Sequence, residues 1–267
     1  MSDLAARIRE TTVSPGDLAI FWLGQAGFVY KTSRDVVFYV DVYLSDCLRR
    51  LFPERGDGFK RVMPAPLAAE EVEADYWIST HSHVDHLDVD VIPMVAARQD
   101  VRFVGSPDCR AMYEALGLGK HRTAILAEGE TLELDGCWLT GVYADHGERL
   151  PDAIGVMLEI DGIHVWQVGD TAYRPERWST LFDRGVDIII PPINGAFGNL
   201  DAAESAQLVA RSGAAVAIPC HFWMFTLHNG QPAEFLQLCR ELAPQTHVLL
   251  MTQGERFVYH RASLSSE

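Results

Sequence analysis

Short apolar runs separated by turn residues mark out the first half of the chain. Runs at residues 18–23, 28–30 and 36–40 predict three strands, and residues 24–27 supply the turn between the first two. The periodicity then predicts a helix over 66–73, a strand over 75–80, a helix over 87–98, a strand over 102–105 and a helix over 107–116. Residues 53–66 hold three prolines and two glycines, which predicts a loop able to overhang a site.

The second half begins with two hairpins. Asp135-Gly136 and Asp161-Gly162 each lie between alternating apolar stretches, and an Asp-Gly pair in that setting is a strong hairpin signal. The predicted hairpin strands cover residues 131–134, 137–144, 155–160 and 163–168. Strands over 186–190, 215–219 and 248–251 and helices over 202–212 and 233–242 complete the chain.

The order of these elements predicts the fold class. Strands outnumber helices, and strands followed by a helix recur in both halves of the chain. This order favours an α+β protein built as a four-layer αββα sandwich, with two mixed sheets face to face and helices outside. Because no long linker rich in Gly, Pro or Ser divides the chain, we expect residues 1–267 to form a single domain.

Charge and composition narrow the classes of partner. The chain has 37 acidic and 22 basic residues, a formal charge of −15, which disfavours nucleic acid and anionic membrane surfaces as partners. The first 17 residues lack the apolar core of a signal peptide, and no window approaches ~20 consecutive apolar residues. The five cysteines are widely spaced and suggest reduced thiols. We expect a cytoplasmic protein with a small-molecule substrate and leave a homo-oligomer open.

A cluster of histidines and acids follows the strand predicted over residues 75–80. His81 and His83 alternate on an extended segment, while Asp85 and His86 lie where the chain turns toward a helix. Their side chains can therefore converge. Imidazole nitrogen and carboxylate oxygen are ligands that zinc and similar ions prefer, so the cluster predicts a metal site.

These four groups are too few for two ions, but other strand ends supply more ligands. His146 ends one apolar run, Asp170 follows a second run and Gly169, and His221 follows a third. Each residue alone could serve as a turn residue or be satisfied locally. Together with the first cluster they form a consistent set of candidate metal ligands.

The set resembles the metallo-β-lactamase fold superfamily, and the resemblance covers nearly the whole chain. It is carried by His81-x-His83-x-Asp85-His86, followed in order by the ligand candidates further along the chain. Further motifs look like the branch that contains L-ascorbate-6-phosphate lactonase: residues 22–27 (WLGQAG), 41–46 (DVYLSD), 192–195 (PING) with 198–199 (GN), and 218–222 (IPCHF). The resemblance implies an αββα fold. It also implies that His81, His83 and His146 hold one ion, that Asp85, His86 and His221 hold the other, and that Asp170 bridges them.

The expected chemistry is hydrolysis by a hydroxide that bridges two divalent ions, which polarise the attacked carbonyl. We expect Asp85 to orient the water or to carry its proton, and Asp41 to fix a ligand histidine by hydrogen bonding. His228 could touch the substrate, donate a proton to the leaving group or be a loop residue. Candidate substrate-binding residues are Gln25, Asn194, Asn199, Trp223 and Asn229. Lys60, Arg61, Arg149 and Arg174 lie in loops near the motifs, and the sequence does not select among them as ligands for a substrate phosphate.

Several functions and metals remain open at this point. The branch resemblance favours a lactonase or esterase acting on a small sugar-derived substrate, with or without a phosphate. A phosphodiesterase or nuclease of the same fold is the alternative, which the charge of −15 disfavours. A non-catalytic metal or redox module would require loss of a ligand or iron in place of the usual ion. Zn²⁺ and Mn²⁺ are the candidate ions, with Fe²⁺ as a further one.

Overall fold

The apolar runs form two seven-stranded mixed sheets in the computed structural model, which describes residues 2–261. The first sheet has the order β14 (Arg256–His260), β1 (Asp17–Gly24), β2 (Gly27–Lys31), β3 (Val37–Val40), β4 (Tyr76–Ser79), β5 (Arg102–Gly105), β6 (Thr123–Ile125). The second has the order β13 (His247–Val248), β12 (Val216–Ala217), β11 (Ile188–Ile190), β10 (Ile163–Gln167), β9 (Ile154–Ile160), β8 (Cys137–Tyr143), β7 (Thr131–Leu134).

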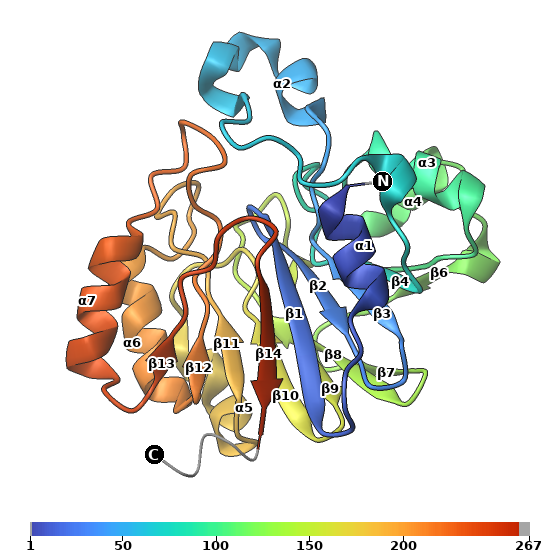
Figure 1. The fold of residues 1–267 in the computed structure, drawn as a ribbon. Coiled ribbons are helices and arrows are strands. Elements are labelled where there is room, and N and C mark those ends of the chain that lie inside the picture. Colours follow the sequence, from blue (N-terminus) through green and yellow to red (C-terminus); the bar gives the residue numbers. More distant parts are fainter. Residues whose placement is uncertain (1, 262–267) are drawn as a thin grey trace.

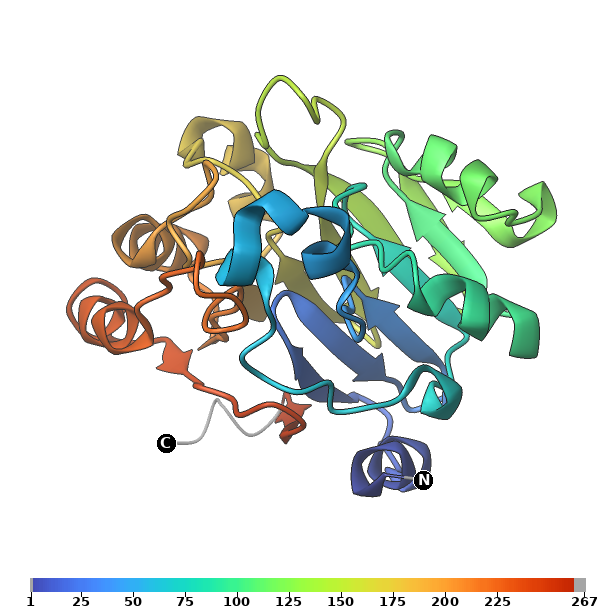
Figure 2. The ribbon, with the colours of Figure 1, turned by 90° about the horizontal axis from the view of Figure 1, so that it is seen from above.

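The sheets pack face to face, and helices cover both outer faces (Figures 1 and 2). Helices α1 (Asp3–Glu10), α3 (Val91–Arg98) and α4 (Cys109–Ala115) cover the first sheet, and α6 (Ala202–Ser212) and α7 (Pro232–Leu242) cover the second. Two short helices, α2 (Cys47–Leu51) and α5 (Ser179–Asp183), come after β3 and β10 in the chain. The layers are therefore those of the predicted αββα sandwich. Among residues 2–261, no helix is long and apolar enough to cross a membrane.

Strand β1 shows why its apolar run is continuous. Leu18 and Ile20 point into the core between the two sheets, whereas Ala19 and Phe21 point into the core between the first sheet and its helices. A strand buried on both faces needs apolar residues at every position rather than at alternate ones. The same logic applies to the central strands of the second sheet, such as β11.

Both predicted Asp-Gly hairpins are confirmed. Asp135 and Gly136 join β7 to β8, and Asp161 and Gly162 join β9 to β10. All four residues have φ between 50° and 80°, as a two-residue type I′ turn requires.

The helix predicted over residues 66–73 is wrong. Only Ala69–Glu71 form a 3₁₀ turn, and extended backbone follows at Val72. Leu67 and Val72 are both buried in the same core. In an α-helix, residues five positions apart point about 140° away from each other, so an extended segment around a short turn buries both.

Some elements were not predicted, and others differ at their ends. Helices α1, α2 and α5 and strands β6 and β14 are additional to the prediction, while β12 and β13 are shorter than expected. The signal for α1 was present: Leu4, Ala5 and Ile8 lie on one buried face, and Ser2 Oγ accepts a hydrogen bond from Ala5 N at 3.3 Å. Helix α3 begins at Val91, later than predicted.

The predicted overhanging loop at residues 53–66 contains a 3₁₀ segment, Pro53–Phe59, directly after α2. Figure 2, which looks down from above, shows this part of the chain crossing over the loops at the top of the sheets. The Phe59 ring meets those of Phe197 and Phe225 at centroid distances of 6.1 and 6.0 Å. These contacts fasten the segment to loops that follow β11 and β12.

Candidate metal centre

The histidine cluster is shaped by a tight turn after β4. The backbone N–H groups of His86 and Leu87 both donate to the carbonyl of His83, at 2.9 and 2.8 Å, and Ser79 Oγ donates to the carbonyl of His86 at 3.1 Å. This turn brings His81, His83, Asp85 and His86 toward one region. Only His83 among these four is exposed.

The second sheet supplies the other three candidates from its strand ends. His146 follows β8, Asp170 follows β10, and His221 follows β12. Gly169 has φ +75°, and a Cβ at this position would lie 2.7 Å from the Ile154 carbonyl oxygen, so only glycine allows the approach that places Asp170. His221 itself has φ 61°, a conformation that non-glycine residues rarely adopt.

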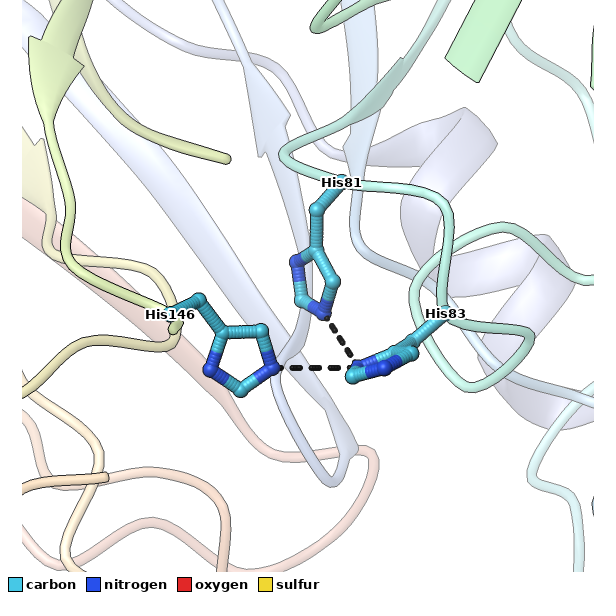
Figure 3. A group of neighbouring side chains, drawn as sticks. All are labelled: His81, His83 and His146. Carbon is cyan, nitrogen blue, oxygen red and sulfur yellow. Dashed lines mark hydrogen bonds between the residues drawn. The ribbon is translucent and has the colours of Figure 1, made fainter. Parts of the chain in front are cut away.

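His81, His83 and His146 form the first group of facing ligand atoms (Figure 3). Nδ1 of His83 lies 3.0 Å from Nε2 of His81 and 3.1 Å from Nε2 of His146. Two nitrogens bound tetrahedrally to one zinc ion at ~2.1 Å would be about 3.4 Å apart. The observed separations are close to that value, so small adjustments would let the three rings share an ion.

Asp85, His86 and His221 form the second group. Nε2 of His86 lies 3.3 Å from Nε2 of His221, and Asp85 Oδ2 lies 3.9 and 4.0 Å from these two nitrogens. All three residues are buried, whereas the first group reaches solvent at His83. The two groups therefore differ in their access to solvent.

Asp170 lies between the groups. Its Oδ1 is 3.3 Å from Nε2 of His221 and 3.5 Å from Nε2 of His86, while its Oδ2 is 3.8 Å from Nε2 of His146. Asn199 Nδ2 donates to Asp170 Oδ2 at 2.7 Å and so holds the carboxylate in place. One oxygen thus faces each group, which is the placement a bridging ligand needs.

Burial and neighbouring charges shift the pKa values of several candidate ligands. Burial raises the pKa of Asp170, but nearby His221 and His86 outweigh it and hold the pKa well below its ordinary value. Burial lowers the pKa of His81 and of His146. Ionised carboxylate and neutral imidazole are the forms in which these groups bind metal.

A buried oxygen without a hydrogen-bond partner also favours a bound cation at this site. Oδ1 of Asp170 is buried and has no hydrogen-bond partner among the described residues. Such a buried carboxylate oxygen is costly unless a donor or a metal ion is present. The buried acids, the facing imidazoles and this oxygen together suit divalent ions.

Asp41 has the supporting position that the sequence suggested. It follows β3, and its Oδ2 lies 3.0 Å from Nδ1 of His86. Thr80, which was not predicted, donates to Asp41 from its backbone N–H and from its hydroxyl, both at 2.8 Å. Burial lowers the pKa of His86, but Asp170 and Asp41 outweigh burial and raise it well above the ordinary value.

Four predicted substrate or catalytic residues are buried: Gln25, Asn194, Asn199 and His228. The His228 ring stacks on His221 with centroids 4.7 Å apart, and burial, together with neighbouring His221, lowers the pKa of His228 to about 3. Asn199 and Gln25 also contact candidate metal ligands, Asp170 and Asp85 respectively. Asn194 donates to the carbonyl of Ala196 at 3.4 Å. Trp223 and Asn229 are exposed. Among residues 2–261, neither side chain forms a hydrogen bond or ring contact with a predicted ligand.

The four basic residues considered as ligands for a substrate phosphate differ in whether they already have partners. Arg61 donates to the carbonyls of Tyr43 and Met63, and Arg174 pairs with Asp145 at 2.9 Å, so both already have partners. Within residues 2–261, the exposed side chains of Lys60 and Arg149 make no hydrogen bond or ion pair.

Sequence reasoning also missed Asp88, a buried acid that ties two loops together. Its carboxylate accepts hydrogen bonds from the backbone of Leu44 and Ser45, both at 2.8 Å, and from Val91 at 3.2 Å. Its position near the start of the helix predicted over residues 87–98 was a signal for capping. The left-handed backbone of Gln25, Asp41 and Trp223, in contrast, had no signal in the sequence.

Comparisons with known proteins agree with this geometry. A family model described as beta-lactamase superfamily domain matches residues 43–222. A UPF0173 metal-dependent hydrolase of Archaeoglobus fulgidus is 25% identical over 256 residues, covering 91% of this chain and 100% of the relative.

Solved structures give the same fold. Igni18, a metallo hydrolase from Ignicoccus hospitalis, superposes with a TM-score of 0.72 at 18% identity, covering 91% of this chain and 98% of that one. The metallo-beta-lactamase fold protein YhfI from Bacillus subtilis superposes with a TM-score of 0.67 at 16% identity, covering 91% and 100%. The fold is thus that of the metallo-β-lactamases.

Proposed function

Because this chain belongs to the beta-lactamase superfamily, we propose that it is a hydrolase that uses two divalent metal ions. The observation that carries this proposal is the arrangement of two ligand groups, each with three side chains, on either side of Asp170. The names of relatives, metal-dependent hydrolase and metallo hydrolase, support the same class of reaction.

The chain's own residues have distinct tasks in this proposal. Bound ions would supply an activated water and polarise the bond to be broken. Asp170 and Asp85 supply negative charge to the centre, and Asn199 donates to the Asp170 carboxylate at 2.7 Å. Asp85 is also placed to hold the attacking water or to accept its proton. Asp41 holds the ring of His86 in one orientation.

The substrate we propose is a small ester or lactone, as the narrower resemblance to the lactonase branch implies. The charge of −15 would repel a polyanion. Neutral amides such as Asn194, whose buried Oδ1 has no hydrogen-bond partner among the described residues, suit the hydroxyl groups of a sugar-derived ring. Exposed Phe197 lies against His228, with ring centroids 5.6 Å apart, and offers an apolar wall beside the centre.

If the substrate carries a phosphate, we assign its recognition to Lys60 or Arg149. Both side chains are exposed and unengaged within the described part of the chain, whereas Arg61 and Arg174 already have partners. One cation is sufficient for a single phosphate, in contrast to the many that a nucleic acid requires.

A panel of substrates tests the proposal. We expect hydrolysis of sugar-derived lactones or their phosphates, followed by proton release in lightly buffered solution, with the Asp85→Asn variant as the blank. Bis-p-nitrophenyl phosphate and RNA represent the phosphodiesterase and nuclease alternative. Efficient metal-dependent cleavage of RNA with no lactone turnover would overturn the substrate class, and failure on every substrate of the panel would count against hydrolysis.

The identity of the ions follows from a second measurement. Ligands made of His and Asp without cysteine suit Zn²⁺, Mn²⁺ and Fe²⁺. The lactonase resemblance favours Mn²⁺, and the imidazole-rich first group suits Zn²⁺ equally well. Elemental analysis of protein purified without added metal, followed by reconstitution with each ion, distinguishes them.

A further inference from the structure

Gln25 has an unusual place in the fold. It lies in the turn between β1 and β2, is fully buried and has φ 52°. Its carbonyl oxygen accepts hydrogen bonds from Trp22 Nε1 at 3.1 Å and from the backbone N–H of His221 at 3.0 Å. A left-handed conformation is costly for a non-glycine residue and persists only where its surroundings hold it. The backbone of Gln25 is therefore fixed against that of a candidate metal ligand.

The side-chain amide nitrogen of Gln25 has more hydrogen-bond acceptors within reach than it has hydrogens. Nε2 lies 2.9 Å from Asp85 Oδ2, 3.1 Å from His221 Nε2 and 3.2 Å from His228 Nδ1. An amide nitrogen carries two hydrogens, so three acceptors cannot all be satisfied. At the other end of the amide, Oε1 is buried without a hydrogen-bond partner among the described residues.

Metal binding would change which end of the Gln25 amide, the nitrogen or the oxygen, faces Asp85 and His221. Nε2 of Gln25 lies 2.9 Å from Asp85 Oδ2 and 3.1 Å from His221 Nε2. The candidate ligand atoms lie at similar distances from each other, such as 3.3 Å between Nε2 of His86 and Nε2 of His221. A cation held by Asp85 and His221 would repel the N–H groups and attract the oxygen. The oxygen and nitrogen of an amide exchange places by a half-turn, and their assignment follows from the neighbouring groups.

We propose that Gln25 is a further ligand of the second metal ion, through its side-chain oxygen. This inference rests on the metal centre of the proposed function and adds Gln25 to the group of Asp85, His86 and His221. Oxygen from a glutamine amide is a normal ligand for hard divalent ions. With the amide turned, His228 Nδ1 is placed to donate a hydrogen bond to this oxygen and to steady it.

The proposal makes the two ions unequal. The second ion has four buried side chains of its own, whereas the first has three histidines, of which His83 reaches solvent. An ion with fewer protein ligands keeps a position open for water or substrate. The first ion is therefore the one at which the substrate enters, and the second is the more tightly held.

Metal titration of three variants tests the assignment. Gln25→Met keeps the length of the side chain but removes its hard oxygen, Gln25→Glu keeps an oxygen and adds charge, and Gln237→Met is the matched control on the exposed face of α7. Zn²⁺ binding is measured by calorimetry. The d–d absorption of the Co²⁺-loaded protein reports the ligands of each ion.

We expect Gln25→Met to bind one ion as the natural protein does and to bind the other at least about 10-fold more weakly, since even residues that only support a ligand contribute on this scale. The Co²⁺ spectrum should change in Gln25→Met and Gln25→Glu and stay unchanged in Gln237→Met. Gln25→Glu should bind the second ion at least as tightly as the natural protein.

Different results identify which proposal fails. Two ions bound with natural affinity and an unchanged Co²⁺ spectrum in Gln25→Met would overturn the ligand role while leaving the metal centre intact. If Gln25→Met does not fold, an unchanged Co²⁺ spectrum in Gln25→Glu overturns the ligand role instead. A natural protein that binds no more than one ion would contradict the binuclear centre itself.

Discussion

Asp41 Oδ2 lies 3.0 Å from Nδ1 of His86, on the side of the imidazole ring opposite the nitrogen that faces the other candidate ligands. In the neutral ring, a hydrogen on Nδ1 facing the Asp41 carboxylate leaves Nε2 without a hydrogen, which is the tautomer that binds metal. The two hydrogen bonds from Thr80 keep the Asp41 carboxylate in position. Asp41 thus lies behind the candidate ligand His86, on the side away from the other candidate ligands.

Replacing Asp41 tests this relationship. We expect Asp41→Ala to lower kcat/KM by roughly 10- to 100-fold while at least one ion stays bound, the usual scale for losing a partner of a ligand histidine. Steady-state kinetics and elemental analysis of the same preparation measure both effects. Asp100→Ala, at a surface acid that is 98% exposed, is the control and should change neither. Full activity in Asp41→Ala would show that the contact between Asp41 and His86 has no role.

Asp170 should behave differently because its two oxygens face both ligand groups. We expect Asp170→Ala to abolish measurable turnover and to reduce the metal content of the purified protein. Asn199→Ala removes only the hydrogen bond that Asp170 accepts, so we expect a decrease of about 10- to 100-fold with metal retained. Equal metal loss in Asp170→Ala and Asp41→Ala would contradict the division between bridging ligand and supporting residue.

A core substitution separates stability from chemistry. Leu208 on α6 is fully buried against the second sheet, whereas Leu242 on α7 is 48% exposed. We expect Leu208→Ala to lower the free energy of unfolding by about 2–5 kcal/mol, through lost apolar burial and the cavity left behind. Leu242→Ala should change it by no more than about 0.5 kcal/mol. Urea denaturation measures both, and similar values for the two variants would contradict the packing of α6 against the sheet.

Local patterns made much of the fold predictable. The apolar run of β1 and the Asp-Gly pairs at 135–136 and 161–162 act within a few residues, so the sequence alone identifies them. The segment at 66–73 misled because its apolar residues meet one core from extended backbone rather than from one helical face. Strand β14 was missed although Phe257, Val258 and Tyr259 form a short run of strand-favouring residues.

In the candidate centre, too, the residues could be predicted from local sequence, whereas several of their contacts depend on the fold. The segment from His81 to His86 could be recognised because its groups are close in sequence, and His146, Asp170 and His221 because each follows a strand. The contacts of Gln25 with Asp85 and His221 come instead from backbone conformations that only the folded chain imposes. Pairing of Thr80 with Asp41 likewise depends on β3 and β4 lying side by side.

The central claim is that this fold holds two divalent ions, and ion content measures it most directly. The protein is dialysed extensively against metal-free buffer, titrated with Zn²⁺ or Mn²⁺, and its bound metal is determined by elemental analysis. Two groups of facing ligands with Asp170 between them predict close to two ions per chain. A content that never exceeds about one ion per chain, at any concentration that keeps the protein folded, would contradict the claim.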